Sequence, residues 1–422
     1  MKYLNTLSFS KKILSIALSS IFLLSACGEE TTSSSGAGFS TEDLNTNTDF
    51  DQGKLIENIV DNVITPTYQK FATVAAVQQQ VINNYCQQES ALLENEGSAE
   101  QVNDTKLLAQ AGWRNAMNSW QHAEMMQLSP LLISDGALRN NIYSWPIQNT
   151  CGVDLDVTYF KINSVNGQPY DIANRTASRK SMVALEYLLF NENLAHTCTG
   201  LTVPESWNNQ TDQYRKVARC EYAVEVASDI ELNSQALLTA WLGNGTDVVG
   251  YANELKAAGT EGSEFETDHN AVNKLSDALF YIEGFTKSAK LAEPLGIQFN
   301  ECGSQVCPEI VESKYSNHSL ENIINNLRAF KQLIQGNGGI GFRDYLIDVG
   351  DTITADSLDA DIDQVLASVE AYQLSLAETL ESNPAQVEQT HTEVKSITDT
   401  LKSDFINSLA LELPVTAAGD ND

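Results

Sequence analysis

The sequence predicts an all-α protein made of two helical bundles. Apolar residues recur at three- and four-residue spacing through long stretches, which is the spacing of one helical face. Alternating β-branched residues bounded by hairpin turns are missing, apart from a weak strand candidate at residues 154–162. The chain has only nine prolines in 422 residues, so long helices can run without interruption. These observations predict amphipathic helices packed as bundles.

The first predicted helix covers residues 54–85, where Ile56, Ile59 and Val63 begin the apolar face and Pro66 should kink or split the helix. A second helix is expected from about residue 103 to 128, ending near Pro130. The same periodicity predicts further helices at about 134–142, 172–190, 211–241, 269–290, 317–335, 361–381 and 384–411.

Two loops rich in Gly, Asn and Thr interrupt this pattern, at about residues 191–210 and 243–268. A division inside the second loop gives bundles at 53–245 and 246–415, each with four or five helices. That is enough for a bundle in each half. The similar layout of the halves predicts a duplicated architecture.

The N-terminus has the pattern of a secretory signal. Three lysines precede an apolar run from Ile13 to Leu24, which is shorter than the roughly 20 residues that span a bilayer. Leu24-Ser25-Ala26-Cys27 resembles a bacterial lipobox, so residues 1–26 are the expected signal peptide and Cys27 the lipidated, palmitate-bearing first residue of the mature chain. Residues 27–52 then form a polar, flexible tether. Gly28 after the cysteine, instead of Asp, favours the outer membrane, facing the periplasm.

The charge balance excludes several classes of partner. Lys and Arg number 25 against 56 Asp and Glu, a formal net charge of −31. Nucleic acids and anionic lipid surfaces bind through clustered basic residues that release counterions. We therefore expect no nucleic-acid partner, and contact with the membrane only through the lipid anchor.

Six cysteines remain after Cys27, an even number suited to an oxidising compartment. Cys302 and Cys307 enclose a short loop and are the expected pair. Cys198 with Cys220, and Cys86 with Cys151, would complete three bridges, but six cysteines allow other pairings and the spacing does not choose among them.

Several residue strings together resemble the imelysin family, whose members are exported iron-regulated proteins and lipoproteins sometimes called insulin-cleaving metallopeptidases. The resemblance covers residues 54–411 and implies an all-helical fold of two bundles with a functional cleft between them. The strings, in order, are Trp113-Arg114, Trp120-Gln121-His122-Ala123-Glu124, Tyr143-Ser144-Trp145-Pro146-Ile147, the segment 178–190, Leu275-Ser276-Asp277-Ala278-Leu279 and Glu293-Pro294-Leu295-Gly296.

The family motif is Gly-x-His-x-x-Glu, in which His and Glu share one helical face and could share a metal ion or a proton. Here Glu186 is retained, but Ser181 replaces the glycine and Val183 replaces the histidine. Valine has no lone pair to donate, so the two-ligand site is broken. No His-Glu-x-x-His or Gly-x-Ser-x-Gly motif is present either. The sequence therefore predicts no catalytic residue and specifies no metal ligands.

Four polar residues that match or neighbour polar family positions are expected to line a ligand-binding cleft: Glu124, Arg179, Glu186 and Asp277. A carboxylate flanked by core residues, as Glu186 is, needs a cation or several hydrogen-bond donors. Arg179, two helical turns earlier, could supply that charge. The alternative is a buried Arg179–Glu186 pair that only fixes helix register.

Two other patterns resemble metal sites but are better explained by helix ends. His318 and Glu321 have the His-x-x-Glu spacing at an expected helix start, where an acidic residue favours the helix dipole. Residues 359–370 have carboxylates at the spacing of a calcium loop, but Gln364 stands where that loop turns on glycine.

The expected function is a non-catalytic, imelysin-like envelope lipoprotein that acts as a binding component in iron uptake. The resemblance alone supplies the link to iron, so the cofactor stays unspecified, with iron or another cation as the candidate. Envelope proteins of iron uptake are the candidate partners. Two alternatives stay open. One is a metallopeptidase that uses Glu186, Glu124 and Asp277 with water, and the other is a structural envelope lipoprotein whose cleft is vestigial.

Overall fold

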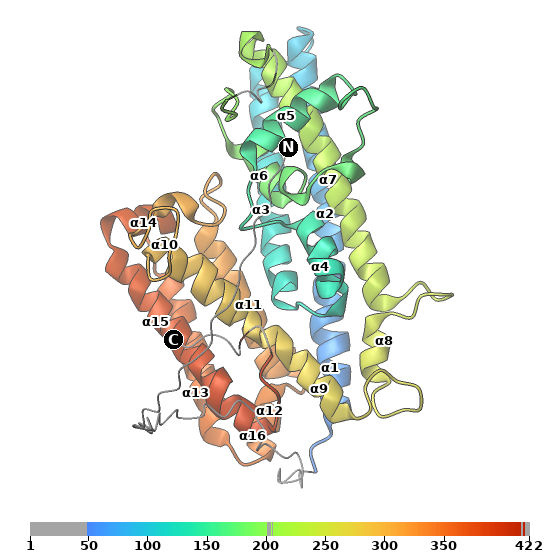
Figure 1. Cartoon of the computed structure of the whole chain (residues 1–422), viewed down its shortest axis with the longest axis vertical. Coiled ribbons are helices and arrows are strands. Elements are labelled where there is room, and N and C mark those ends of the chain that lie inside the picture. Colours follow the sequence, from blue (N-terminus) through green and yellow to red (C-terminus); the bar gives the residue numbers. More distant parts are fainter. Residues whose placement is uncertain (1–48, 201–203, 205, 415–416, 418–422) are drawn as a thin grey trace, which may run out of the picture.

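The computed structural model describes residues 49–200, 204, 206–414 and 417, and no β-strand occurs among them. Figure 1 shows two groups of helices that lie side by side, one from each half of the chain. The predicted all-α class is confirmed. The signal peptide, Cys27 and most of the tether lie outside the described residues. None of the described helices combines the length and apolar character needed to cross a membrane.

The N-terminal half is built on the long helix α2, which packs along α3 and α7 (Figure 1). A π-helical turn, η2, joins α1 to α2. The elements of this half are α1 (Gln52–Asn58), η2 (Ile59–Ile64), α2 (Thr65–Leu93), α3 (Ala99–Met125), α4 (Ser129–Ile142), α5 (Thr150–Lys161), η3 (Ile172–Asn174), η4 (Ala177–Arg179), α6 (Met182–Phe190), η5 (Trp207–Asn209) and α7 (Asp212–Leu242).

The C-terminal half meets the first half through α11, which packs against α3 (Figure 1). Its elements are α8 (Tyr251–Lys256), α9 (Asp268–Ser276), η6 (Asp277–Phe280), η7 (Ile282–Ala292), α10 (Glu293–Leu295), η8 (Pro308–Ile310), α11 (Ser319–Gln335), η9 (Gly336–Gly338), α12 (Phe342–Asp348), α13 (Thr352–Glu370), α14 (Leu376–Ser382), α15 (Pro384–Thr400), η10 (Leu401–Phe405) and α16 (Ile406–Leu409). Buried apolar residues form one core cluster across both halves. The division near residue 245 stays a prediction.

Pro66 lies in the first turn of α2, directly after the π-helical turn η2, so the break expected there is a local change of helix type. Proline has no N–H and cannot donate to the carbonyl four residues earlier. That carbonyl belongs to Asn62, and it accepts a hydrogen bond from the Asn337 side chain at 3.2 Å. The C-terminal half thus satisfies a group that the proline leaves free.

Some predicted elements differ from the structure, and three of these differences have a clear local pattern. Residues 154–162, the weak strand candidate, lie almost wholly in α5, which begins where the Asn149 side chain accepts from the Gly152 N–H at 2.8 Å. The predicted helix at 172–190 is helical as α6 only from Met182, after two short 3₁₀ turns. The predicted helix at 361–381 is two helices, because Ser375 and Glu378 form a capping box that starts α14.

Three disulfides cross-link the described chain, and only one has the predicted pairing. Cys302–Cys307 is confirmed. The other two bridges are Cys86–Cys220 and Cys151–Cys198, so the pairs Cys198–Cys220 and Cys86–Cys151 suggested by the sequence are wrong. The reason is tertiary: α2 and α7 lie side by side and bring the Cα atoms of Cys86 and Cys220 to 5.1 Å.

Candidate functional site

The two halves meet at a cluster of buried polar side chains, which we call the inter-bundle network. Helix α3 supplies Gln121 and Glu124, and η7 and α11 supply Lys290 and Asn326. The connecting segments add further side chains. The complete network consists of Gln121, Glu124, Tyr143, Tyr281, Lys290, Glu312 and Asn326, all of them buried.

Lys290 is the centre of this network and is only 1% exposed. Its Nζ donates to Gln121 Oε1 at 2.6 Å and to Asn326 Oδ1 at 2.7 Å. It also forms an ion pair with Glu312 Oε2 at 3.1 Å. A buried ammonium group is tolerable only when it is paired and hydrogen-bonded in this way. Glu312 therefore neutralises the ammonium charge, while amide oxygens from both halves of the chain accept its hydrogen bonds.

Glu312 also links the network to the N-terminal half. Its Oε1 accepts from the Tyr143 hydroxyl at 2.7 Å and from Gln121 Nε2 at 3.2 Å. Burial, together with the neighbouring carboxylate of Glu312, raises the pKa of Tyr143 well above its usual value. Tyr143 therefore stays a neutral donor to Glu312.

Glu124 lies in the same network but is less well satisfied. It is 1% exposed, and its Oε2 has no hydrogen-bond partner among the described residues. Burial raises the pKa of Glu124 to about 7, with Lys290 acting in the opposite sense and Glu312 adding to the rise. A carboxyl group in this setting can gain or lose a proton near neutral pH.

Glu186, the retained residue of the family motif, lies in α6 and faces the C-terminal half. Its Oε1 accepts from the Ser316 N–H at 2.9 Å and from the Ser316 hydroxyl at 2.8 Å. Burial raises the pKa of Glu186 to about 7, although these hydrogen bonds oppose the rise. Its contacts hold the 313–316 segment against α6.

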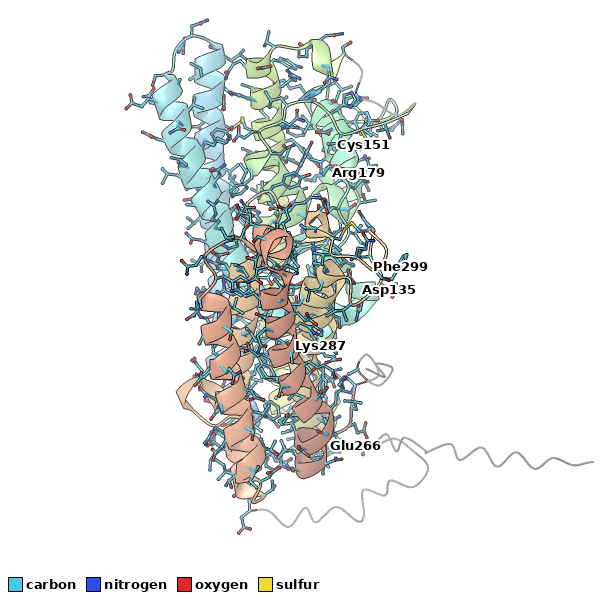
Figure 2. The ribbon with its side chains drawn as sticks, turned by 90° about the vertical axis from the view of Figure 1, so that its left-hand side faces the viewer. Asp135, Cys151, Arg179, Glu266, Lys287 and Phe299 are labelled. Atoms are coloured by element: carbon cyan, nitrogen blue, oxygen red, sulfur yellow. A yellow bond between two sulfur atoms is a disulfide. The ribbon has the colours of Figure 1, made fainter. Side chains whose placement is uncertain are left out.

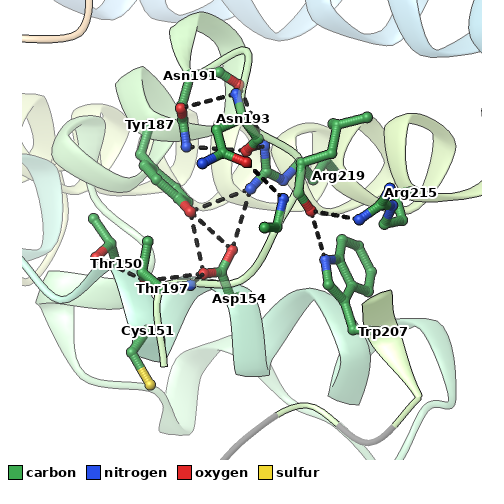
Figure 3. Close-up of polar contacts among 12 residues, drawn as sticks. Thr150, Cys151, Asp154, Tyr187, Asn191, Asn193, Thr197, Trp207, Arg215 and Arg219 are labelled. Atoms are coloured by element: carbon green, nitrogen blue, oxygen red, sulfur yellow. Dashed lines mark hydrogen bonds and ion pairs between the residues drawn. The ribbon is translucent and has the colours of Figure 1, made fainter. Parts of the chain in front are cut away.

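Arg179 does not pair with Glu186, so that part of the sequence interpretation is wrong. Arg179 is the last residue of η4, and its Nη1 lies 3.5 Å from Oδ1 of Asp156 in α5. The buried arginine beside α6 is Arg219, which is 3% exposed. Figure 3 shows Arg219 with Asp154 and Tyr187: its Nη2 lies 3.4 Å from Asp154 Oδ1 and donates to the Tyr187 hydroxyl at 3.2 Å. This contact stabilises the N-terminal half only.

Asp277 also lies apart from the inter-bundle network. It forms an ion pair with Lys274 at 2.7 Å, and burial raises the pKa of its carboxyl. Asp277 lines a cavity of about 550 Å³ that also contacts Tyr281, a member of the network. The four predicted cleft residues therefore occupy three places: Glu124 and Glu186 face the junction of the halves, Asp277 lines this cavity, and Arg179 is elsewhere.

The helix-end interpretation is confirmed for His318 and Glu321, at the start of α11, but is wrong for residues 359–370, which lie inside α13 and not at its start. His318 precedes α11 and its Nε2 lies 2.7 Å from Asn118 Oδ1, while burial lowers its pKa to about 4. Asp359 lies within the continuous helix α13, where its side chain bonds to Arg343 and Gln335. No calcium loop forms in this part of the described chain.

The residues at the family motif do not fit a resident metal ion. Val183 is buried and offers no ligand atom, and Glu186 already accepts two hydrogen bonds from Ser316. Across the described residues, the only group of three potential metal ligands within reach of one another is Cys302, Cys307 and Glu309. The two sulfur atoms of that group form a disulfide, which removes them as thiolate ligands.

A second cavity, of about 370 Å³, opens next to the 313–316 segment that Glu186 holds. Trp145 and Gln148 line it from the N-terminal half, and Lys314 and Tyr315 from the C-terminal half. Three carboxylates also line it, those of Glu293, Glu301 and Glu309. We call it the acidic cavity.

The raised pKa values predict that stability falls as pH rises. Glu124 and Glu186 have pKa values of about 7 in the folded chain, against 4.5 for an ordinary glutamate. Between these values the folded state retains protons that the unfolded state has released. The free energy of unfolding should therefore fall by up to about 1.4 kcal/mol per pH unit for each group, and this loss should end above pH 7. Urea unfolding from pH 5 to 8 measures this slope, which should become shallower in Glu124→Gln. An unchanged slope in that variant would contradict the assignment.

Comparison with known proteins agrees with this architecture. The imelysin family model matches residues 64–403. Iron-regulated protein A of Synechococcus elongatus is 26% identical over 306 residues, which is 72% of this chain and 65% of that protein. The chain thus spans just under two thirds of that relative. The crystal structure of an imelysin-like protein from Psychrobacter arcticum superposes with a TM-score of 0.63 at 16% identity, covering 87% of this chain and 99% of that one. With the family model matched over most of its length, the chain belongs to the imelysin family.

Proposed function

We propose that this protein is a non-catalytic binding component of the cell envelope that serves iron uptake. The observation that carries the non-catalytic part is the state of the family motif. Val183 replaces the histidine, and the retained Glu186 is engaged by Ser316. The name of the cyanobacterial relative, iron-regulated protein A, supports the link to iron.

The acidic cavity is the proposed binding region for the iron-linked ligand. It lies between the halves, as binding sites between domains commonly do. Carboxylate oxygens suit hard cations, and the net charge of −31 attracts cations toward the protein. Glu293, Glu301 and Glu309 line the cavity without forming a preformed cluster of ligands. The bound species would therefore complete its coordination with its own water or organic ligands.

Glu186 acts in this proposal as a positioning residue. It does not line the acidic cavity, but its two hydrogen bonds hold Ser316, and the adjacent Tyr315 and Lys314 are cavity walls. Loss of these bonds would loosen one wall of the cavity.

The proposed location is the periplasmic face of the outer membrane, with Cys27 as the lipid anchor and residues 27–52 as the tether. The acidic body would stay away from anionic lipid headgroups because like charges repel. Envelope proteins of iron uptake are the proposed partners.

Calorimetric titration of the mature chain tests this function, with ferrous ion, ferric ion supplied from a weak chelate, calcium and zinc. We expect saturable binding of an iron species, weakened about tenfold in Glu309→Gln, which removes a cavity carboxylate. Glu186→Gln should weaken binding less while its unfolding temperature shows an intact fold. Glu89→Gln is the matched control, because Glu89 is also buried and hydrogen-bonded, by Tyr85 and Gln213, but lies in α2 away from this cavity.

Each outcome of the titration has a meaning for the proposal. Equal binding by the unmodified chain and Glu309→Gln would remove the acidic cavity as the site. No heat with either iron species would overturn the role in iron binding and would favour the alternative of a structural lipoprotein with a vestigial cleft.

A further inference from the structure

The cavity of about 550 Å³ beside η7 has features of a ligand site, and we call it the η7 cavity. It lies between the halves. Leu132 lines it from α4, and Glu412 lines it from the C-terminal segment. Phe280 of η6, Phe285 of η7 and Tyr281 between these two elements complete the aromatic part of the wall. Its size falls in the range of small-molecule pockets, which are mostly apolar with a few polar groups.

Gly284 is the first sign that this space is kept open. It lies inside η7 and lines the cavity, and a Cβ atom placed there would meet no atom within 4 Å. Glycine inside a helix is less favourable than alanine, because it loses more conformational freedom on folding. No described neighbour comes close enough to prevent a side chain at this position. The glycine therefore enlarges the cavity and does not stabilise the helix.

The backbone next to Leu132 is the second sign. Ser134, Asp135 and Gly136 follow one another with φ values of 54°, 56° and 69°, in the left-handed region that non-glycine residues rarely adopt. Figure 2 labels Asp135 on this segment, at the edge of the molecule. Strained backbone of this kind is concentrated at binding and active sites. The segment is tied to the cavity wall by Arg139, whose guanidinium lies 5.8 Å from the centre of the Phe285 ring.

The charges on the cavity wall favour a positive ligand. Asp277 and Glu412 line the cavity together with one cation, Lys274, which already pairs with Asp277 at 2.7 Å. Within the described chain, the Glu412 carboxylate has no ion-pair partner. The wall therefore has a net negative charge inside a protein whose overall field also attracts cations.

We propose that the η7 cavity binds a small organic cation with an apolar body, such as an aromatic or alkyl amine. The apolar body would contact Leu132 and Phe280 and fill the space above Gly284, and the charged group would lie near Asp277 and Glu412. This inference rests on the proposed binding role of the protein and adds a ligand class for Asp277. The iron-linked ligand is assigned to the other cavity, so iron titration and amine titration can fail independently.

Titration of the mature chain with benzylamine, benzamide and benzoate tests the proposal, because the three probes have similar size and shape but differ in charge. Ligand-observed NMR suits the millimolar affinity expected of molecules this small. Benzylamine should bind at least fivefold more tightly than benzamide, and benzoate least. Asp277→Asn should weaken benzylamine at least threefold and leave benzamide unchanged. Asp399→Asn is the matched control, since Asp399 is an exposed carboxylate of α15 that pairs with Lys395.

Gly284→Leu gives an independent readout by filling the cavity. It should abolish binding of benzylamine and benzamide, while Gly284→Ala should raise the unfolding temperature because its Cβ meets open space. If Gly284→Leu lowers the unfolding temperature, Asp277→Asn decides the question. Benzylamine binding no tighter than benzoate would overturn the proposal, as would undiminished binding to a folded Gly284→Leu variant.

Discussion

Replacing Lys290 with methionine is expected to lower the free energy of unfolding by about 3–5 kcal/mol. Methionine matches the length of the lysine stem but removes the ammonium group that donates to Gln121 and Asn326 and pairs with Glu312. Glu312, 1% exposed, would then be a buried charge without a cation. The loss is large because the carboxylate has no access to water. Urea unfolding at pH 7 measures it.

Two further variants distinguish the loss of the inter-bundle network from the general effect of removing a lysine. Lys331→Met removes a lysine that pairs with Asp363 at the surface, and it should cost less than about 1 kcal/mol. Adding Glu312→Gln to Lys290→Met should recover part of the loss, since it neutralises the orphaned carboxylate. If Lys290→Met costs no more than Lys331→Met, the network does not hold the halves together as described.

Removing the Cys86–Cys220 bridge, by replacing both residues with alanine, should lower the free energy of unfolding by about 5 kcal/mol. The bridge joins α2 to α7 across a sequence separation of 134 residues. In the chain-entropy model, a cross-link that closes a long loop restricts the unfolded chain more than one that closes a short loop. Equilibrium unfolding without reductant measures the change.

The Cys302–Cys307 bridge is the matched control, because its sequence separation is only 5 residues. The double alanine variant at that bridge should cost about 2 kcal/mol. A larger loss at Cys302–Cys307 than at Cys86–Cys220 would contradict the chain-entropy explanation and would indicate that the short bridge supports its surroundings in the folded state.

The helical class could be predicted because helical periodicity is a local property of the sequence. The predictions failed where a single side chain decides a boundary. Ser375 ends one predicted helix by capping the next, and Asn149 starts a helix where β-branched residues suggested a strand. Such caps depend on the conformation of one residue, which periodicity does not register.

The candidate site could be predicted only in part. Glu124 and Glu186 were identified because they are carboxylates within apolar helical stretches, a pattern visible in sequence. Their surroundings were not, since Lys290 meets Gln121 across 169 residues and Ser316 meets Glu186 across 130. Arg179 was misassigned for a related reason: its seven-residue spacing from Glu186 places both on one face only if the helix is continuous.

Most of the disulfide pairing could not be predicted for the same reason, because it depends on contacts between residues far apart in the sequence. Only Cys302–Cys307 is local enough to be specified by spacing, and the other two bridges follow from which helices and loops lie side by side. A lysine at position 290, between alanine and leucine near the end of η7, is a sequence signal that could have indicated a buried cation at the junction.

Whether the protein binds without cleaving is tested most directly by incubating the mature chain with an unfolded protein substrate, with added ferrous or zinc ions, and analysing the products by mass spectrometry. Val183 in place of the motif histidine, and Glu186 bound by Ser316, predict that no peptides are released under any of these conditions. Peptide release that stops when the metal is chelated would contradict the non-catalytic assignment.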